Sequence, residues 1–214
     1  MKLHLGCGEV HLDGYTNIDY PPTEHTIQKT SIADKYCDIT KLKYPLNSIE
    51  EVRLHHVFEH FPRAKAIALF VSWVSWLKVG GKLTIEVPDF QKMSKIYNSP
   101  LSSIKQKNIA IRHIFGSQEA EWAVHYHGWS ARDLLDMASF ARLEGSCHRS
   151  QSQVNIHNIT FVATKTKRIS RSSTRAAVVK YLSHYMVDQS VTKKNMLKEW
   201  MKSYDEQVAK SWGK

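Results

Sequence analysis

The residues near the start of the chain that are best suited to chemistry are a glycine turn, Gly6-Cys7-Gly8, and a carboxylate, Asp19. Glycine lets the backbone approach a ligand closely and adopts φ angles that a Cβ forbids. A carboxylate at the end of the next strand can accept hydrogen bonds from both hydroxyls of a ribose. A dinucleotide fingerprint does not fit, because His11 replaces the third glycine and Asp19 comes too early. The pattern indicates a nucleotide site, with an ordinary glycine turn between strands as the alternative.

A second chemical cluster, His55-His56 followed by Glu59-His60, lies between a predicted strand and a predicted helix. Histidine is an effective general base near neutral pH, because its unperturbed pKa is about 6.5. The spacing from His56 to His60 also matches the H-x-x-E-H pattern of inverted zinc proteases. That site needs one continuous helix, whereas Pro62 favours the start of a new one. We therefore favour a base over a zinc site, and for Glu59 and His60 the alternative is helix capping and packing.

Short strands alternating with helices must position these residues. Period-two patterns and turn residues predict strands over 2–5, 16–18, 35–39, 51–56, 82–87, 142–148 and 155–164. Apolar residues at helical spacing predict helices over 62–78, 91–97, 104–115, 130–140, 175–187 and 193–212. Gly80-Gly81 is expected to end the first of these helices. Only seven residues separate Gly8 from Thr16, so the first crossover helix must be shortened to about one turn, since a crossover with a full helix takes roughly 10–12 residues.

Four segments, in this order, resemble the motifs of small, type-11-like class I S-adenosylmethionine (SAM)-dependent methyltransferases. They are LGCG at 5–8, NID at 17–19, HVFEHF at 56–61 and LKVGGKL at 77–83. The resemblance covers approximately residues 2–165. It implies an α/β fold with a Rossmann-like, seven-stranded, mostly parallel sheet and an antiparallel last strand. It also divides the chain into a methyltransferase domain at 1–165 and a basic, α-helical C-terminal extension at 166–214.

The resemblance implies SAM as the cofactor and assigns residues to it. The glycine turn would lie under the methionine part, Asp19 would hold the ribose, and Asp38 would bind the adenine amino group. A turn or capping role is the alternative for Asp38, and its small size is a sufficient reason for Cys7 to lie in the turn. His4 occupies a position that is usually acidic in the family. The residues assigned to the cofactor are His4, Gly6, Cys7, Gly8, Asp19, Asp38, Ile39 and His55.

The candidate catalytic residues are His56, His127 and Asp89. Either histidine would act as the base, because related enzymes bring a histidine of each segment to the active site. Residues 91–128 are expected to form a substrate lid, whose polar, aromatic and histidine-rich end suits a polyhydroxylated substrate. We predict O-methylation of a small polar molecule such as a sugar or glycan precursor. No metal is predicted: Mg²⁺ bound by His125, His127 and Asp89 is disfavoured, because a hard cation prefers several oxygen ligands.

The net charge of +10 lies mainly at the C-terminal end, where residues 165–214 hold 12 Lys and Arg against 4 Asp and Glu. Such a tail can bind nucleic acid or another anionic surface, although a charge run is more often a solvated helix face. Two alternative functions follow. One is a non-catalytic methyltransferase-fold module whose tail binds nucleic acid or an anionic surface. The other is a nucleic-acid methyltransferase, against which the sequence has no Asn/Asp-Pro-Pro-Tyr motif.

The last predicted helix carries an apolar stripe that must be covered, either by the domain itself or by a second copy in a homo-oligomer. Its members are Leu197, Trp200, Met201, Tyr204 and Val208. The sequence has no run of about 18 apolar residues that predicts a membrane span. It also has no apolar signal segment before the first strand, so we expect a cytoplasmic protein. The three cysteines have no paired spacing and predict neither a disulfide framework nor a zinc knuckle.

Overall fold

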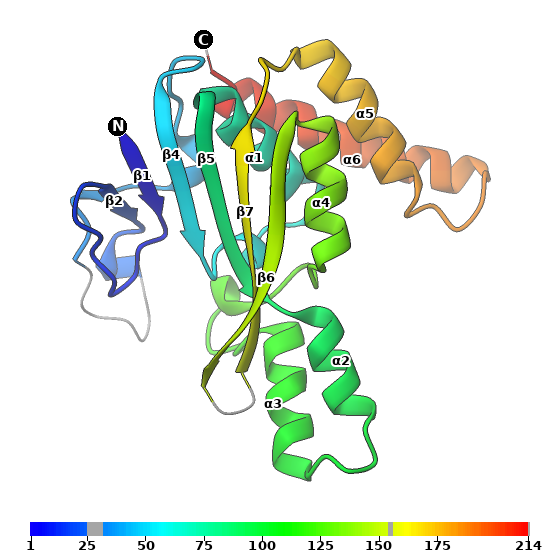
Figure 1. Ribbon diagram of the computed structural model, residues 1–214. Helices are drawn as coiled ribbons and strands as arrows, with labels where there is room; N and C mark the ends of the chain where they lie inside the picture. The colour runs from blue at the N-terminus through cyan, green and yellow to red at the C-terminus, as the bar shows by residue number, and fades with distance from the viewer. Residues whose placement is uncertain (25–31, 154–155, 214) are drawn as a thin grey trace.

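In the computed structural model, which describes residues 1–24, 32–153 and 156–213, the chain forms a seven-stranded sheet flanked by helices (Figure 1). The strands are β1 (Lys2–Leu5), β2 (Thr16–Asp19), β3 (Lys35–Tyr36), β4 (Ile49–His55), β5 (Leu77–Pro88), β6 (Leu143–Gln153) and β7 (Ile156–Lys165). Their order in the sheet is β3-β2-β1-β4-β5-β7-β6. β1 to β5 run parallel, whereas β7 is antiparallel to both β5 and β6. The predicted α/β sheet with an antiparallel last strand is confirmed.

Helices lie on the sheet and beyond both of its ends. The α-helices in the described residues are α1 (Arg63–Trp76), α2 (Phe90–Asn98), α3 (Ile104–Phe115), α4 (Ala131–Phe140), α5 (Arg171–Ser183) and α6 (Val191–Ser211). Short 3₁₀ helices are η1 (Pro22–Glu24), η2 (Ile39–Lys41), η3 (Phe58–His60) and η4 (Glu121–Ala123). In Figure 1, α2 and α3 extend past the end of the sheet to which β4 points, and α5 and α6 lie at the opposite end. No helix in the described part of the chain has both the length and the apolar composition needed to cross a bilayer.

The first crossover is short, as the sequence predicts, but the single turn of helix expected there is absent. Residues 6–15 form turns and contain no helix. β2 therefore returns directly beside β1, with Leu3 opposite Thr16 and Leu5 opposite Ile18. β3 is shorter than predicted and ends at Tyr36, because Asp38 starts η2 by accepting a hydrogen bond from Thr40 N at 2.9 Å.

The prediction that Gly80-Gly81 ends the long helix is wrong. α1 ends at Trp76, and β5 begins immediately at Leu77, which pairs with Ile49 of β4. The register of the two strands then shifts between Ile49 and Glu51. A Cβ on Gly81 would lie 2.9 Å from Lys78 O and 3.0 Å from Glu50 O. The second glycine therefore serves a bulge in the sheet, where β4 and β5 approach closely.

The apolar stripe of α6 is covered by its own chain, because α6 packs along α1 (Figure 1). Tyr204 and Val208 are each 1% exposed. Trp76 Nε1 donates to Ser211 O at 2.7 Å, and Ser211 Oγ donates to Ser72 Oγ at 2.9 Å. The C-terminal helix is thus tied to the core helix by both apolar contacts and buried hydrogen bonds. Helix α5 begins at Arg171, four residues earlier than predicted, after a cap by Ser170.

Lys165, the last residue of β7, is a buried cation at the end of α1. Its side chain is 1% exposed. Its Nζ donates to Val74 O at 2.8 Å, to Leu77 O at 2.7 Å and to Asn47 Oδ1 at 3.0 Å. A helix leaves the carbonyls of its last turn without partners inside the helix, so Lys165 satisfies them. Burial, assisted by the charge of Arg168, lowers the pKa of Lys165 from 10.5 to about 8.

Replacing this cation tests its role. Lys165→Met is expected to lower the free energy of unfolding by at least about 2 kcal/mol, because each buried carbonyl left without a donor costs about 1–3 kcal/mol. Between about pH 8 and 10.5 the unfolded state binds the proton that the folded state has lost, so wild-type stability rises with pH there. The destabilisation should therefore be larger at the top of this window than at neutral pH. Urea unfolding at both pH values measures these effects. Lys167→Met is the control, because Lys167 is exposed. An equal loss of unfolding free energy in the two variants would contradict the role assigned to Lys165.

Candidate functional site

A cleft of about 1010 Å³ opens at the carboxyl ends of β1, β2 and β4. The strand order reverses at β1, and ligands of open α/β sheets bind in the crevice at such a point. Five separate stretches of the chain meet in this cleft. It is lined by every residue assigned to the cofactor and by one candidate base: His4, Gly6, Cys7, Gly8, Asp19, Asp38, Ile39, His55 and His56.

The glycine turn forms one wall of the cleft. Its φ angles are 68° at Gly6 and 55° at Gly8, which side chains rarely tolerate. The amides of Gly6 and Cys7 both donate to Ile18 O, at 2.8 and 3.2 Å. A Cβ on Gly6 would lie 2.3 Å from Val57 Cγ2. The turn therefore needs glycine both for its backbone angle and for its contact with the segment that follows β4.

Asp19 lies at the end of β2 with its carboxylate held in place by backbone amides. Its Oδ2 accepts from Gly8 N and its Oδ1 from Tyr20 N, each at 2.7 Å. The side chain is mostly buried, with 7% of the residue exposed. An ionised carboxylate offers about four lone-pair positions. Two therefore remain for hydroxyl groups of a ligand in the cleft.

Two side chains beside the turn are neutral. Burial, with a further contribution from the charge of Asp19, raises the pKa of Cys7 to about 12. Its thiol therefore stays protonated, which agrees with a role of small size and opposes nucleophilic attack. Burial lowers the pKa of His4 below its usual value, and His4 Nδ1 donates to Asn17 Oδ1 at 3.1 Å. A neutral imidazole at this position does not repel a cationic ligand.

Arg53 lines the cleft and was not among the predicted site residues. It lies on β4 directly opposite His4 of β1, so its side chain is on the same face of the sheet. Val52 and Leu54 on either side are fully buried. The sequence signal was a cation between the apolar Val52 and Leu54, which period-two alternation places on one face with His55.

Asp38 and Ile39, the residues predicted to bind adenine, line the same cleft. Asp38 caps η2 through Oδ1, and its Oδ2 is 3.7 Å from Lys41 Nζ. Ile39 is 8% exposed and belongs to the core. The capping role considered for Asp38 is therefore present. It does not conflict with ligand binding, because the residue also lines the cleft.

His55, the last residue of β4, and His56, which follows it, are each hydrogen-bonded to a different carboxylate. His55 Nε2 donates to Glu86 Oε1 at 3.0 Å, and His56 Nδ1 donates to Glu59 Oε1 at 3.2 Å. The predicted strand ends one residue early, at His55, because His56 has a φ of 53°. Burial alone would lower the pKa of His56, but the hydrogen bond to Glu59 and the charges of Glu59 and Glu86 outweigh it and raise this pKa.

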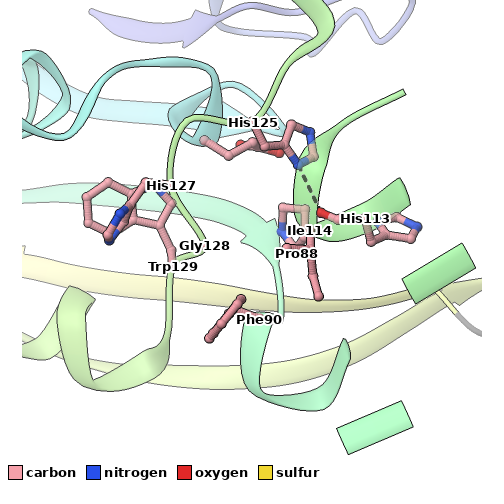
Figure 2. Close-up of a pocket in the computed structure, with 9 residues that line it drawn as sticks. Pro88, Phe90, His113, Ile114, His125, His127, Gly128 and Trp129 are labelled. Atoms are coloured by element: carbon pink, nitrogen blue, oxygen red, sulfur yellow. Dashed lines mark hydrogen bonds between the residues drawn. The ribbon is translucent and has the colours of Figure 1, made fainter. Parts of the chain in front are cut away.

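Asp89 and His127, the other predicted catalytic residues, lie outside the residues that line the large cleft. Asp89 is fully buried; it caps α2 through Lys92 N at 3.0 Å and pairs with Arg149 Nε at 2.7 Å. His127 lines a separate small cavity, with its ring edge against Trp129 (Figure 2). Burial and the nearby charge of Arg63 lower the pKa of His127 to about 4, so it is neutral.

The end of the expected lid contributes exposed aromatic rings to the cleft. Trp122 and Tyr126 line it and are 41% and 56% exposed. Tyr126 N donates to Glu59 O at 2.9 Å, which fixes this part of the lid to the segment after β4. Trp129 instead is 1% exposed and stacks on Phe58, with ring centroids 4.5 Å apart. Trp129 therefore anchors the loop, whereas Trp122 and Tyr126 present exposed ring surface at the cleft.

Comparison with known proteins establishes the fold. No protein-family model and no curated protein matches the sequence. A chain in the complex between the Haloferax volcanii Trm112 methyltransferase activator and a putative methyltransferase is 12% identical, with a TM-score of 0.51 over 79% of this chain and 83% of that one. A protein from Pyrococcus horikoshii is 16% identical, with a TM-score of 0.50 over 76% and 80%. A SAM-dependent methyltransferase from Methanosarcina mazei is 14% identical, with a TM-score of 0.49 over 76% and 91%. The chain has the class I SAM-dependent methyltransferase fold.

Substitutions at two glycines with similar φ angles can distinguish the cost of backbone strain from the cost of a steric contact. Gly14 has a φ of 79° and open space around a Cβ, whereas Gly6 has a φ of 68° and meets Val57. Gly14→Ala is expected to cost about 1–2 kcal/mol of stability through the left-handed angle alone. Gly6→Ala should cost clearly more, because the contact with Val57 must also shift. Chemical unfolding of both variants measures the difference, and equal costs would contradict the close approach.

Proposed function

We propose that this chain is a SAM-dependent methyltransferase. The observation that carries the proposal is the convergence of the glycine turn, Asp19, the Asp38-Ile39 pair and His56 on one cleft. The cleft of about 1010 Å³ is large enough for a nucleoside cofactor and a small substrate, since ligand pockets usually measure about 300–1,000 Å³. The glycine turn also lets the backbone itself line the cleft, so a ligand can lie directly against it. The residues present therefore fit this cofactor.

The cleft contains residues suited to bind each part of the cofactor. The free lone pairs of Asp19 would accept the two ribose hydroxyls, and Asp38 would accept the adenine amino group above Ile39. Arg53 is the cation on the cleft wall beside the glycine turn, and we assign it to the carboxylate of the methionine part. Neutral His4 next to it allows the ammonium group of that part to bind without repulsion.

The chain's own contribution to the reaction is alignment and removal of a proton. SAM, when bound, supplies an activated methyl group whose sulfur leaves as a neutral thioether. The cleft would hold a substrate hydroxyl in line with that methyl group, which is the main source of rate enhancement for such a leaving group. We assign the base to His56 rather than to His127, because only His56 lines the cleft. Its Nδ1 donates to Glu59, so Nε2 would accept the hydroxyl proton and Glu59 would stabilise the resulting imidazolium.

The substrate class follows from the lid. Trp122 and Tyr126 place aromatic surface at the cleft mouth, which suits the C–H faces of a sugar. His60 and Lys65 add polar groups on the same lining, which suit hydroxyl or phosphate oxygens. A polyhydroxylated small molecule, such as a sugar or a glycan precursor, fits this combination. The product would be its O-methyl derivative.

The cofactor proposal is tested by calorimetric titration with SAM and with S-adenosylhomocysteine. We expect wild type to bind both, and Asp19→Ala to bind at least tenfold more weakly, a loss of about 1.4 kcal/mol or more. Asp13→Ala is the control, because the Asp13 side chain is fully exposed and lies outside the cleft lining. Absence of binding in wild type, or equal affinity in Asp19→Ala, would refute the assignment.

The base is tested with His56→Asn. Asparagine tolerates positive φ angles as histidine does, so the backbone at this position is retained. Turnover of SAM with a panel of sugar and glycan-precursor acceptors should fall by roughly 10²–10⁴-fold, the usual contribution of a general base. SAM affinity should be unchanged. His148→Asn, at an exposed position on β6, is the control. Undiminished turnover in His56→Asn would exclude it as the base.

A further inference from the structure

A second cluster of chemical groups lies at the border between the cleft and the lid, and the proposed reaction leaves most of it unused. Glu59 and His60 come from η3, and His125 follows η4 in the lid. One carboxylate oxygen and one ring nitrogen from each histidine lie within 4.8 Å of one another. The two imidazole rings meet edge to face, with centroids 4.8 Å apart. Residues 65 positions apart in the sequence are thus brought to one point.

The carboxylate of this cluster is buried with one oxygen unsatisfied. Glu59 is 1% exposed. Its Oε1 accepts from His56 Nδ1, but its Oε2 has no hydrogen-bond partner among the described residues. A buried acceptor without a donor is unfavourable, and more so when it is charged. A cation bound to Oε2 would remove this cost.

Both histidines are oriented as metal ligands usually are. His60 Nδ1 donates to Val124 O at 3.1 Å, and His125 Nδ1 donates to His113 O at 2.9 Å (Figure 2). A carbonyl oxygen only accepts, so Nδ1 is the donor in each ring and Nε2 is the nitrogen that can bind a cation. Backbone carbonyls bonded to the second ring nitrogen are the typical outer shell of metal-bound histidines.

We propose that Glu59, His60 and His125 bind one divalent transition-metal cation of the zinc type. Two imidazoles and one carboxylate are ligands that Zn²⁺ and its first-row neighbours accept, whereas Mg²⁺ and Ca²⁺ require mainly oxygen. Three protein ligands leave a position for water or a substrate oxygen. Because His60 also lines the cleft and His125 belongs to the lid, the cation would join the lid to the cleft wall.

A neighbouring group of similar composition lacks the decisive feature. His55, His56 and Glu86 also lie within reach of one ion. Both oxygens of Glu86 are already satisfied, however. Oε1 accepts from His55 at 3.0 Å and from Asn158 Nδ2 at 2.9 Å, and Oε2 accepts from Thr160 Oγ1 at 2.8 Å. The carboxylate of this group therefore has no unsatisfied oxygen, so we assign the cation to Glu59.

The test is a calorimetric titration with Zn²⁺ of the full-length protein after treatment with a chelator. We expect one equivalent to bind to wild type, and His60→Ala and His125→Ala each to weaken binding by at least about tenfold, since even outer-shell changes cost about 10–100-fold. His55→Ala, from the neighbouring group, should bind as wild type does. Loss in His55→Ala with retention in His125→Ala would overturn the proposal, as would absence of binding in wild type.

A second test measures a new absorption band and does not depend on weakened metal binding. His125→Cys should still bind Co²⁺ and should add a thiolate-to-cobalt charge-transfer band that wild type lacks, because the new thiolate would occupy the ligand position. His55→Cys should show no such band. Circular dichroism checks that both variants are folded. A folded His125→Cys that binds Co²⁺ without the band would refute ligation at this position. Neither measurement involves SAM, so failure of the cofactor proposal leaves this test intact.

Discussion

The reversal of strand order at β1 is the constraint on which the site depends. The chain leaves β1 toward β2 on one side, while β4 lies on the other, and the two exits diverge to open the cleft. The exits nevertheless touch, because the backbone at Gly6 meets the side chain of Val57. Val57 directly follows His56, so the wall proposed for the cofactor and the proposed base are fixed relative to each other. This contact therefore helps to fix the alignment that the proposed methyl transfer would require.

Glu59 connects the parts of this site. Although burial alone would raise its pKa, the hydrogen bond from His56 and the surrounding histidines lower it, so the carboxylate is charged. Its side chain orients His56, and its backbone carbonyl holds Tyr126 of the lid. A buried charge is expensive unless every lone pair is satisfied. The same residue therefore orients the proposed base and leaves one buried oxygen to which the proposed cation would bind.

The basic C-terminal region is also a structural part of the fold. Lys165 donates hydrogen bonds to the carbonyls of Val74 and Leu77 at the C-terminal end of α1. Arg175 of α5 forms a bidentate pair with Asp205 of α6, at 2.8 and 2.7 Å. The apolar stripe of α6 faces α1, so most of the lysines of this helix are left on its exposed side. Much of the positive charge in the tail therefore belongs to a solvated helix face or to internal pairs, as charge runs commonly do.

The sequence by itself predicted the α/β sheet, the short first crossover and the candidate cofactor residues that line the cleft, because those features depend on local patterns. Glycine at 6 and 8, the acid at 19 and the period-two strands are readable in short windows. Tertiary structure alone decided how distant side chains pair. The sequence predicts that Asp89 is catalytic, and only the structure shows that it is buried outside the cleft lining and paired with Arg149 of β6. Glu59 and His125 meet across the sheet's edge for the same reason: side-chain contacts between segments far apart in sequence arise only when the backbone folds, and no local pattern records them.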